Sequence, residues 1–329
     1  MKNLHLLVKK TIVALLILGL GSLLGLEEVP KSKETAPLIA ITQITSHETL
    51  DKIYQGVIEG LKEKGYAQGK GAKILFANAH GDIGTAVQIA QKFVAEKPAV
   101  IIAIATPSAQ SAARVISNTD LQLVFSAVTN PKAAGLVTNY QHPGGNITGT
   151  LSSSPIAEQM SLIHEIMPEL RNLGIVINFG EQNSVDLLEQ VVLAAKEYGI
   201  KVLPAEANSS ADVASATRSL VGKVGAFILV QDNTVASALP SLLQVANNNY
   251  VPTFAVFTEA AQQGAMMEVA YDAYDIGIQT GYIAAHVLDG EPAGSIEVVD
   301  PHKLVIEINK RVADRLSVKL PERLLKYVR

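Results

Sequence analysis

Residues 100–115 read VIIAIATPSAQSAARV, an apolar run that passes straight into a helical pattern at Thr106-Pro107-Ser108. Threonine is a favourable N-cap, and a proline at the first helical position lacks only an N–H that the helix would leave without a partner. The N–H groups of Ser108 and Ala109, together with the Thr106 and Ser108 hydroxyls, are then available to bind a small anion such as a carboxylate. The alternative is an ordinary cap that satisfies only its own backbone.

Polar residues follow other predicted strands in the same way. They are Gln43 with His47 behind it, Thr129-Asn130-Pro131, the segment NFGEQNS (178–184) and the segment QDNT (231–234). Because the carboxyl ends of parallel strands meet at one edge of a sheet, we expect these segments to line a cleft. A cleft rich in Thr, Ser, Asn and Gln suits a small zwitterion or polar metabolite. It lacks the Gly-rich loop and the Lys or Arg cluster that a phosphate chain requires.

The sequence offers little for catalysis. Its seven histidines show no paired metal-ligand spacing, no G-x-S-x-G motif is present, and there is no cysteine for thiolate chemistry or disulfides. His47 alone lies at a predicted cleft edge, where we interpret it as a wall or ligand contact. We therefore predict a protein that is not an enzyme and that uses no metal or cofactor.

Composition sets the scale of the elements that must position these residues. The chain has 329 residues, of which 48% are hydrophobic and 18% charged, enough for two domains with substantial cores. A net charge of −4 with both signs interspersed argues against a nucleic-acid partner.

Strand and helix patterns alternate from residue 38 onward and predict parallel sheets. The first run has strands at 38–44, 72–79, 99–105 and 121–128, with helices at 48–66, 85–97 and 108–117. After HPGGNITG (142–149) a second run has helices at 154–170, 184–199, 210–222 and 236–249, with strands at 173–178, 201–207, 225–231 and 252–257. A last strand (265–272) and helix (275–290) look surplus to this lobe, and they could return to complete the first. The pattern indicates two α/β lobes with a cleft between them.

The N-terminal segment differs from the rest. Three lysines within residues 1–10 precede an uncharged apolar run, Thr11–Leu26, which is typical of an export signal. We predict a cleaved signal over residues 1–26, with an uncleaved membrane anchor as the alternative, and a polar linker over 27–37. Sixteen residues are slightly few for a membrane span, which needs about 20.

Several motifs, taken in order, resemble the substrate-binding proteins of ABC transporters of the tryptophan/tyrosine type. They include AITQITSHETLD, NAHGD, IIAIATPSAQ, VFSAVTNPKAAGLV, PGGNITG, GEQNSV, DNTVASAL and AYDAYDIGIQTG, and the match runs from about residue 38 to 316. The resemblance implies a type I periplasmic-binding fold, with two Rossmann-like lobes joined by a three-stranded hinge. It implies closure around an aromatic amino acid or related small metabolite, followed by delivery to a membrane permease that works with an ATPase.

The resemblance also suggests roles for individual residues. It implies a carboxylate cradle at Thr106 and Ser108 with the N–H groups that follow, including Ala109. First-lobe contacts would be Gln43, Thr129 and Asn130, while the second lobe and hinge would supply Asn178, Glu181, Asn183, Asp232, Asn233 and Asp272. Either Asp232 or Asp272 would meet an ammonium group, although Asp272 is equally suited to capping the helix that follows it.

Three positions depart from the family's usual residues. Ser152 and Phe257 stand where relatives tend to have acids, and Phe179 stands where they tend to have proline. Losing acids removes partners for an ammonium, whereas two phenylalanines add apolar surface. We therefore hypothesise a ligand that is less cationic or more apolar than tryptophan.

These observations predict the following organisation. The first lobe comprises residues 38–148 and 272–296, and the second comprises 149–271 and 297–329. The predicted function is that of an extracytoplasmic, periplasmic solute-binding protein of an ABC importer, acting as a monomer. The alternative is a membrane-anchored regulatory binding protein of the same fold, which an uncleaved N-terminal segment would favour.

Overall fold

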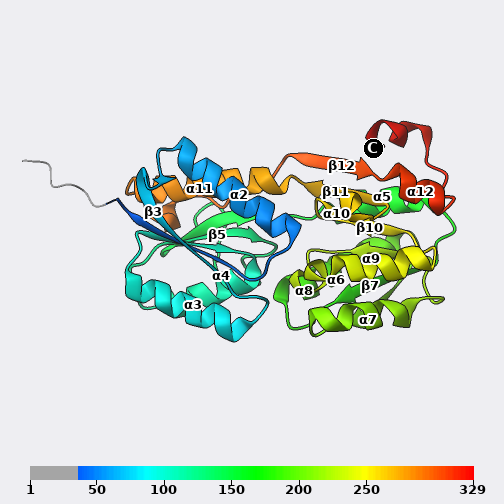
Figure 1. Cartoon of the computed structure of the whole chain (residues 1–329), viewed down its shortest axis with the longest axis horizontal. Helices are drawn as coiled ribbons and strands as arrows, with labels where there is room; N and C mark the ends of the chain where they lie inside the picture. The colour runs from blue at the N-terminus through cyan, green and yellow to red at the C-terminus, as the bar shows by residue number, and fades with distance from the viewer. Residues whose placement is uncertain (1–35) are drawn as a thin grey trace, which may run out of the picture. The chain divides into compact units, whose positions relative to one another are not determined.

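The computed structural model describes residues 36–329, and the predicted export segment and most of the linker lie outside them. The described residues form two six-stranded sheets, each covered by helices on both faces (Figure 1). This is the α/β fold with two parallel-sheet lobes that the sequence predicts. None of the helices within 36–329 has the length and apolar character needed to cross a membrane.

The first sheet has the strand order β2-β3-β1-β4-β5-β6, and all its neighbouring strands are parallel. Its strands are β1 (Leu38–Gln43), β2 (Ala67–Gln68), β3 (Gly71–Asn78), β4 (Val100–Ile104), β5 (Leu123–Val128) and β6 (Ile147–Leu151). Helices α2 (Glu48–Glu63) and α11 (Ala273–Leu288) pack on one face, and α3 (Ile83–Glu96) and α4 (Thr106–Ile116) pack on the other. Successive side chains of β4 point into the two cores in turn, which explains the continuous apolarity of this strand.

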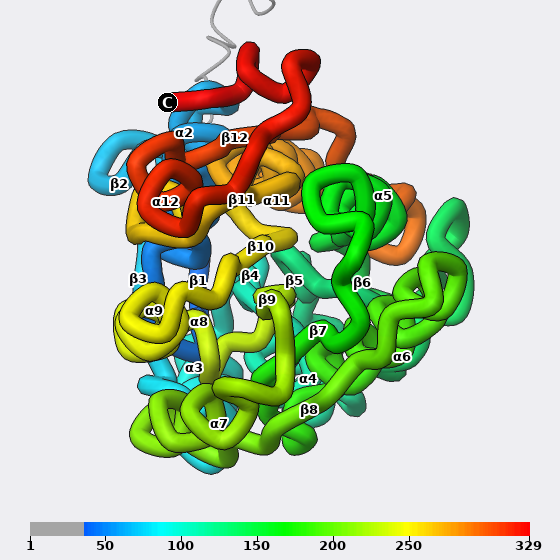
Figure 2. Tube along the Cα trace, turned by 90° about the vertical axis from the view of Figure 1, so that its right-hand side faces the viewer, coloured from blue at the N-terminus to red at the C-terminus, as the bar shows by residue number. Residues whose placement is uncertain are grey.

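The second sheet has the order β12-β11-β10-β9-β7-β8 and is parallel except for β12, which runs antiparallel to β11 (Figure 2). Its strands are β7 (Asn172–Ile177), β8 (Lys201–Glu206), β9 (Ala226–Leu229), β10 (Thr253–Ala255), β11 (Met267–Tyr271) and β12 (Leu304–Ile308). The helices are α5 (Ile156–Ile166), α6 (Gln182–Glu197), α7 (Val213–Leu220), α8 (Asn233–Ser237), α9 (Leu239–Asn248), α10 (Ala260–Gln263) and α12 (Lys310–Arg315). Short 3₁₀ helices are η1 (Ser210–Asp212), η2 (Ala293–Ser295) and η3 (Glu322–Tyr327).

The structure corrects part of the predicted element order. The strand predicted at 265–272 lies in the second sheet as β11, in agreement with the predicted lobe boundaries, and only the helix after it, α11, returns to the first lobe. The predicted helix at 236–249 is two helices, α8 and α9, with Pro240 in the first turn of α9. Strand β6, for which no strand was predicted, belongs to the first sheet, so the first lobe extends to Leu151 and not to the predicted residue 148.

Within the described residues the chain passes between the sheets three times: after β6, after β11 and before β12. These connections are paired with one another. The Leu151 N–H donates to the Val299 oxygen at 2.8 Å, and the Asp272 N–H donates to the Lys303 oxygen at 2.9 Å. The three connections form a hinge that brings the carboxyl ends of both sheets to one region.

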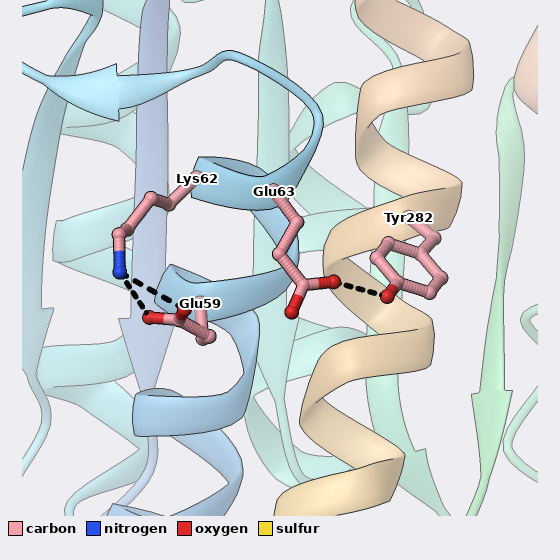
Figure 3. A network of polar contacts seen from close by, with 4 residues as sticks. All are labelled: Glu59, Lys62, Glu63 and Tyr282. Atoms are coloured by element: carbon pink, nitrogen blue, oxygen red, sulfur yellow. Dashed lines mark hydrogen bonds and ion pairs between the residues drawn. The ribbon is translucent and has the colours of Figure 1, made fainter.

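Helices α2 and α11 approach unusually closely along the first lobe. Gly56 and Gly60 of α2 face Gly277 and Gly281 of α11, and a Cβ built on Gly277 would lie 2.1 Å from the Ile53 oxygen. The absence of side chains at these positions allows the two backbones to touch. Farther along, the Tyr282 hydroxyl of α11 donates to the Glu63 carboxylate of α2 (Figure 3). The glycine contact therefore sets the position of α2, whose first turn borders the cleft.

Candidate ligand-binding site

A cavity of about 30 Å³ lies where loops of the two lobes meet. The first lobe contributes His47, Thr49, Leu50, Ile53, Ala105, Thr106, Ala127, Thr129 and Ser152, and the second contributes Asn183, Gln231, Asp232, Asn233, Ala236 and Phe257. Among the described residues, no lysine or arginine lines this cavity. A single water needs about 10–15 Å³, so the walls of this cavity lie close together.

Two alanines at strand ends hold strained backbone beside the cavity. Ala105 follows β4 with φ 74° and ψ 156°, and Ala127, in β5, has φ 55°. Non-glycine residues rarely adopt these conformations, which persist only where surrounding structure over-determines them. Here the Ala105 N–H donates to the Ser126 oxygen at 2.9 Å, and the Ala127 N–H donates to Thr150 Oγ1 at 3.3 Å. The unusual backbone at Ala105 and Ala127 leads the chain to Thr106 and Thr129, which line the cavity.

Helix α4 begins earlier than predicted, at Thr106, with Ala105 as its N-cap. The prediction that Thr106 caps the helix is therefore wrong. So is the expected availability of the Ala109 N–H, which donates to the Ala105 oxygen at 3.1 Å. Thr106 Oγ1 and Ser108 Oγ are buried, and neither has a hydrogen-bond partner among residues 36–329. Thr106 thus brings a buried hydroxyl and the positive end of the α4 dipole to the cavity.

Two buried carboxylates organise the wall from the second lobe. Glu181 accepts from the N–H and side-chain amide of Asn233, from the N–H and hydroxyl of Thr234, and from the Asn183 amide. Asp232 is the N-cap of α8: its Oδ1 accepts from the Val235 N–H at 2.8 Å. These bonds attach the start of α8 to the start of α6, so the cavity residues of both helices move as one unit.

The ionised form of Asp232 is disfavoured, because this carboxylate is buried and lies near the Glu181 carboxylate. Its Oδ2 accepts from the Asn178 N–H at 2.6 Å and from Ser184 Oγ at 2.7 Å. Burial raises the pKa of Asp232, and the nearby Glu181 carboxylate raises it further. A carboxylate has about four lone-pair positions, so Oδ1 can accept one more donor. A cationic ligand group beside this oxygen would offset both causes of the raised pKa.

His47 lies where the two lobes meet. It is the N-cap residue of α2, and it lines the cavity together with Asn233 of the second lobe. Burial lowers the pKa of His47 to about 4, against smaller raising effects of Asn233 and Asp51, so the ring is neutral at pH 7. Its Nε2 is buried, as is Asn183 Oδ1, and within the described chain neither atom has a hydrogen-bond partner.

Half of the residues predicted for the site line this cavity. They are His47, Thr106, Thr129, Asn183, Asp232, Asn233 and Phe257. Asn178 and Glu181 instead border a wider neighbouring groove of about 620 Å³, which shares Asn233 with the cavity. Among the others, Gln43 donates to the Thr45 oxygen and to Asp51, Asn130 accepts from the Ala133 N–H, and Ser108 and Ala109 lie within α4.

Asp272 lies in a different pocket, at the hinge. It caps α11 by accepting from the Asp275 N–H at 3.1 Å, and it pairs with Lys303 Nζ at 2.7 Å. Asp272 therefore has the helix-capping role that the sequence analysis gave as the alternative to ligand binding. Phe179 is 45% exposed, so of the two added phenylalanines only Phe257, 4% exposed, contributes to the cavity wall.

Sequence reasoning missed the contribution of α2. Thr49, Leu50 and Ile53 reach the cavity from its first two turns. The helix was predicted, but its periodicity does not separate residues that fill the core from residues that line a cavity. Gln231 lay within a quoted segment without being named as a site residue. No group of three His, Cys, Asp or Glu within 36–329 could hold a metal ion.

Comparison with known proteins places these features in context. The model of the family described as "ABC transporter substrate binding protein" matches residues 38–329. A tyrosine-binding protein of Clostridioides difficile (strain R20291) is 34% identical over 292 residues, which cover 88% of this chain and 84% of the relative.

Two solved structures of relatives differ in their ligand state. An ABC domain from Streptococcus pneumonia in complex with L-Trp has 30% identity and a TM-score of 0.86, covering 90% of this chain and 100% of that one. The ligand-free, open structure of a Clostridium difficile substrate-binding protein with adhesive properties also has 30% identity, but its TM-score is 0.66, with 87% and 96% covered. At equal identity, the present arrangement is more similar to the ligand-bound relative.

Proposed function

The chain belongs to the ABC transporter substrate-binding protein family, and on that premise we propose that it binds an aromatic L-amino acid in the cavity between its lobes. The observation that carries the proposal is a pair of buried polar atoms on opposite walls. Thr106 Oγ1 comes from the first lobe and Asn183 Oδ1 from the second, and both lack a partner within residues 36–329. Buried polar groups are normally satisfied, so such atoms support a polar ligand that supplies the missing bonds.

The first lobe suits the carboxylate. The start of α4 combines the Thr106 hydroxyl with helix N–H groups that have no partner within the helix and with a favourable dipole. An aromatic zwitterion would place its carboxylate here, as a charge-assisted acceptor.

The second lobe suits the ammonium. Its wall presents acceptors, namely Asn183 Oδ1 and one unfilled lone pair of the Asp232 carboxylate. Asp232 is thus the acid that would meet the ammonium group, and Asp272, at the hinge, would not.

Apolar residues provide for the ligand's side chain. Leu50 and Ile53 come from α2, Ala236 from α8, and Phe257 from the segment after β10. The relatives named for tyrosine and crystallised with tryptophan bind aromatic side chains of different polarity. Because Phe257 adds apolar surface, we propose that this chain favours a ligand more apolar than tryptophan, one whose side chain lacks the polar group that tyrosine and tryptophan carry.

Binding would require motion of the lobes. The cavity of about 30 Å³ is too small for an amino acid unless its walls retreat. A ligand that contacts both lobes would then shift the population toward a closed form fitted around it. We further propose that a membrane permease with its ATPase receives the ligand, that residues 1–26 direct export, and that the protein acts as a monomer.

Isothermal titration with L-tryptophan, L-tyrosine, L-phenylalanine and L-leucine tests the proposal. We expect an aromatic member to bind and Thr106→Val to weaken its binding about 10- to 100-fold, because a hydrogen bond to a charged group contributes about 1.5–3 kcal/mol. Thr138→Val, at an exposed loop position, is the matched control and should bind like the wild type. The proposal is wrong if none of the four amino acids binds, or if Thr106→Val leaves the affinity unchanged. Tightest binding of tryptophan would reject only the preference for a more apolar ligand.

A further inference from the structure

The pocket at the hinge, of about 330 Å³, shares no lining residue with the ligand cavity. The first lobe lines this hinge pocket with Lys52 and Gln55 of α2 and Tyr274 of α11, and the second lobe lines it from the segment after β10 and from β11 and β12. Sites for small molecules have volumes of about 300–1,000 Å³, so the hinge pocket has room for a small one. Such a molecule would contact both lobes.

The charges around the hinge pocket do not balance. Of its four acidic residues, three have a neighbouring cation: Asp272 has Lys303 at 2.7 Å, Glu307 has Arg329 at 2.9 Å, and Glu259 has Lys52. The fourth, Glu268, is buried and forms no ion pair with any residue of 36–329. It also lies directly opposite Glu307 in the sheet. An ionised carboxylate that is buried without a counter-charge is costly, and a bound cation would offset this cost.

A buried hydroxyl lines the same pocket. The Glu268 carboxylate accepts from the Ala261 N–H at 2.8 Å and from the Glu259 N–H at 3.3 Å, which holds it against the segment after β10. Thr258 belongs to this segment and lines the pocket; its side chain is buried, with the residue 6% exposed, and Oγ1 has no hydrogen-bond partner among residues 36–329. Buried polar groups are normally satisfied, so this hydroxyl supports a ligand that bonds to it. The carboxylate, with about four lone-pair positions, can accept two more donors.

A primary ammonium group fits these acceptors, because it combines a positive charge with three N–H donors. A metal ion does not fit, since no group of three His, Cys, Asp or Glu within the described chain could hold one. Val305 and the Tyr274 ring also line the pocket and offer surface to a short aliphatic stem.

We propose that the hinge pocket is a second ligand-binding site, which takes a small organic cation and binds its primary ammonium group on Glu268 and Thr258. This inference is independent of the proposed function, because the two sites have separate residues. Since both lobes line the pocket, the bound cation would stabilise the lobe arrangement described here.

Hexylamine is a suitable probe, with 1-hexanol as its neutral analogue and tetramethylammonium as a cation without N–H donors. Binding is measured by ligand-observed NMR titration at pH 8.0, where Glu268 is ionised, since burial raises its pKa only to about 7. We expect saturable binding of hexylamine with a Kd below about 1 mM. The two analogues should bind at least about 10-fold more weakly, because each lacks the charge or the donors.

Two substitutions of nearly unchanged size test the residues. Glu268→Gln removes the charge and should weaken hexylamine binding about 10- to 100-fold, and Thr258→Val removes the hydroxyl and should weaken it about 3- to 10-fold. Glu206→Gln, at an exposed position of β8, removes one charge elsewhere and should bind like the wild type. Thermal midpoints without ligand establish that each variant folds.

The inference is wrong if the wild type does not bind hexylamine, if it binds 1-hexanol equally well, or if either pocket variant binds hexylamine like the wild type. Loss of hexylamine binding in Asp232→Asn but not in Glu268→Gln would place the amine in the ligand cavity and would also overturn it. None of these results depends on whether an aromatic amino acid binds, so the proposed function stands or falls separately.

Discussion

At the scale of single residues, two buried carboxylates of the second sheet face each other away from the ligand cavity. Glu268 and Glu307 lie opposite each other on β11 and β12, and they are only 2% and 6% exposed. Glu307 pairs with Arg329 Nη1 at 2.9 Å, whereas Glu268 accepts from the Ala261 N–H at 2.8 Å. Burial raises the pKa of Glu268 to about 7, and the neighbouring Glu307 carboxylate contributes to the increase.

This pKa predicts a dependence of stability on pH. The folded-state pKa of Glu268 lies above its unfolded value of 4.5, so the folded protein binds this proton more tightly than the unfolded chain does. The stabilisation that the bound proton provides is therefore fully present below pH 4.5 and is lost as the pH rises through 7. Relative to Glu268→Gln, the wild type should lose about 2–3 kcal/mol of unfolding free energy across this interval, at about 1.36 kcal/mol per pKa unit. Urea denaturation at pH 4.5, 6, 7 and 8 measures the difference.

A matched control for Glu268 is Glu206→Gln, which changes an exposed position of β8. Its unfolding free energy should follow that of the wild type at each pH. A constant gap between wild type and Glu268→Gln at all four pH values would contradict the prediction.

At the scale of elements, the contact between α2 and α11 links the core of the first lobe to the cavity. Ile53 lines the cavity, and its carbonyl oxygen lies against Gly277 of α11. Thr49, one turn earlier in α2, lines the cavity and donates to the Thr258 oxygen of the second lobe at 3.0 Å. A displacement of α2 would therefore change the cavity wall and the contact between lobes together.

Gly277→Ala should disturb both properties. The new Cβ would lie 2.1 Å from the backbone oxygen of Ile53, which can yield only if the helices separate. We expect a loss of about 1–3 kcal/mol in unfolding free energy, as for other overpacked sites, and weaker binding of aromatic amino acids. Chemical denaturation and calorimetric titration provide the two measurements.

Gly84→Ala in α3 is the corresponding control. Its Cβ would meet only Asp82 Oδ1, at 3.2 Å, and alanine is the better helix former. Wild-type or slightly higher stability is expected of this variant. If Gly277→Ala were equally stable, the close approach of α2 and α11 would not be a constraint on the fold.

At the scale of the whole molecule, the lobes are described in a closed arrangement. The Thr49 hydroxyl of the first lobe donates to the Thr258 oxygen of the second, and side chains of both lobes line the small cavity. The chain also resembles a ligand-bound relative more than a ligand-free, open one. Few polar contacts of this kind, each contributing about 1 kcal/mol, leave open and closed forms close in free energy.

Small-angle X-ray scattering should therefore detect closure. Without ligand, we expect a curve that fits a mixture of open and closed forms; with saturating L-tryptophan or L-tyrosine, the radius of gyration should decrease and the closed form alone should fit. Thr106→Val at the same ligand concentration should stay near the ligand-free curve, because fewer molecules are occupied. Identical curves for the wild type with and without a ligand that calorimetry shows to bind would argue against lobe motion.

Much of the fold could be predicted because its signals are local. The strand at β4 and the helix at α2 each carry a pattern of side chains that only one kind of element buries well. Strand β6 was not predicted, because a glycine-rich run such as PGGNITG hides its pairing with β5. For β11 the strand pattern alone did not fix the sheet, because the sheet that a strand joins depends on distant partners.

The sequence by itself determined the two-lobed α/β class and the kinds of residue at the strand ends, because periodicity and turn chemistry are properties of neighbouring positions. Only the tertiary structure decided that Asp232 lies in the cavity while Asp272 lies at the hinge. It also decided that the Ala109 N–H is used within α4, and that His47 Nε2 and Asn183 Oδ1 are buried without a partner among residues 36–329. Whether a polar atom is satisfied depends on residues far away in the chain, and no local pattern contains that information.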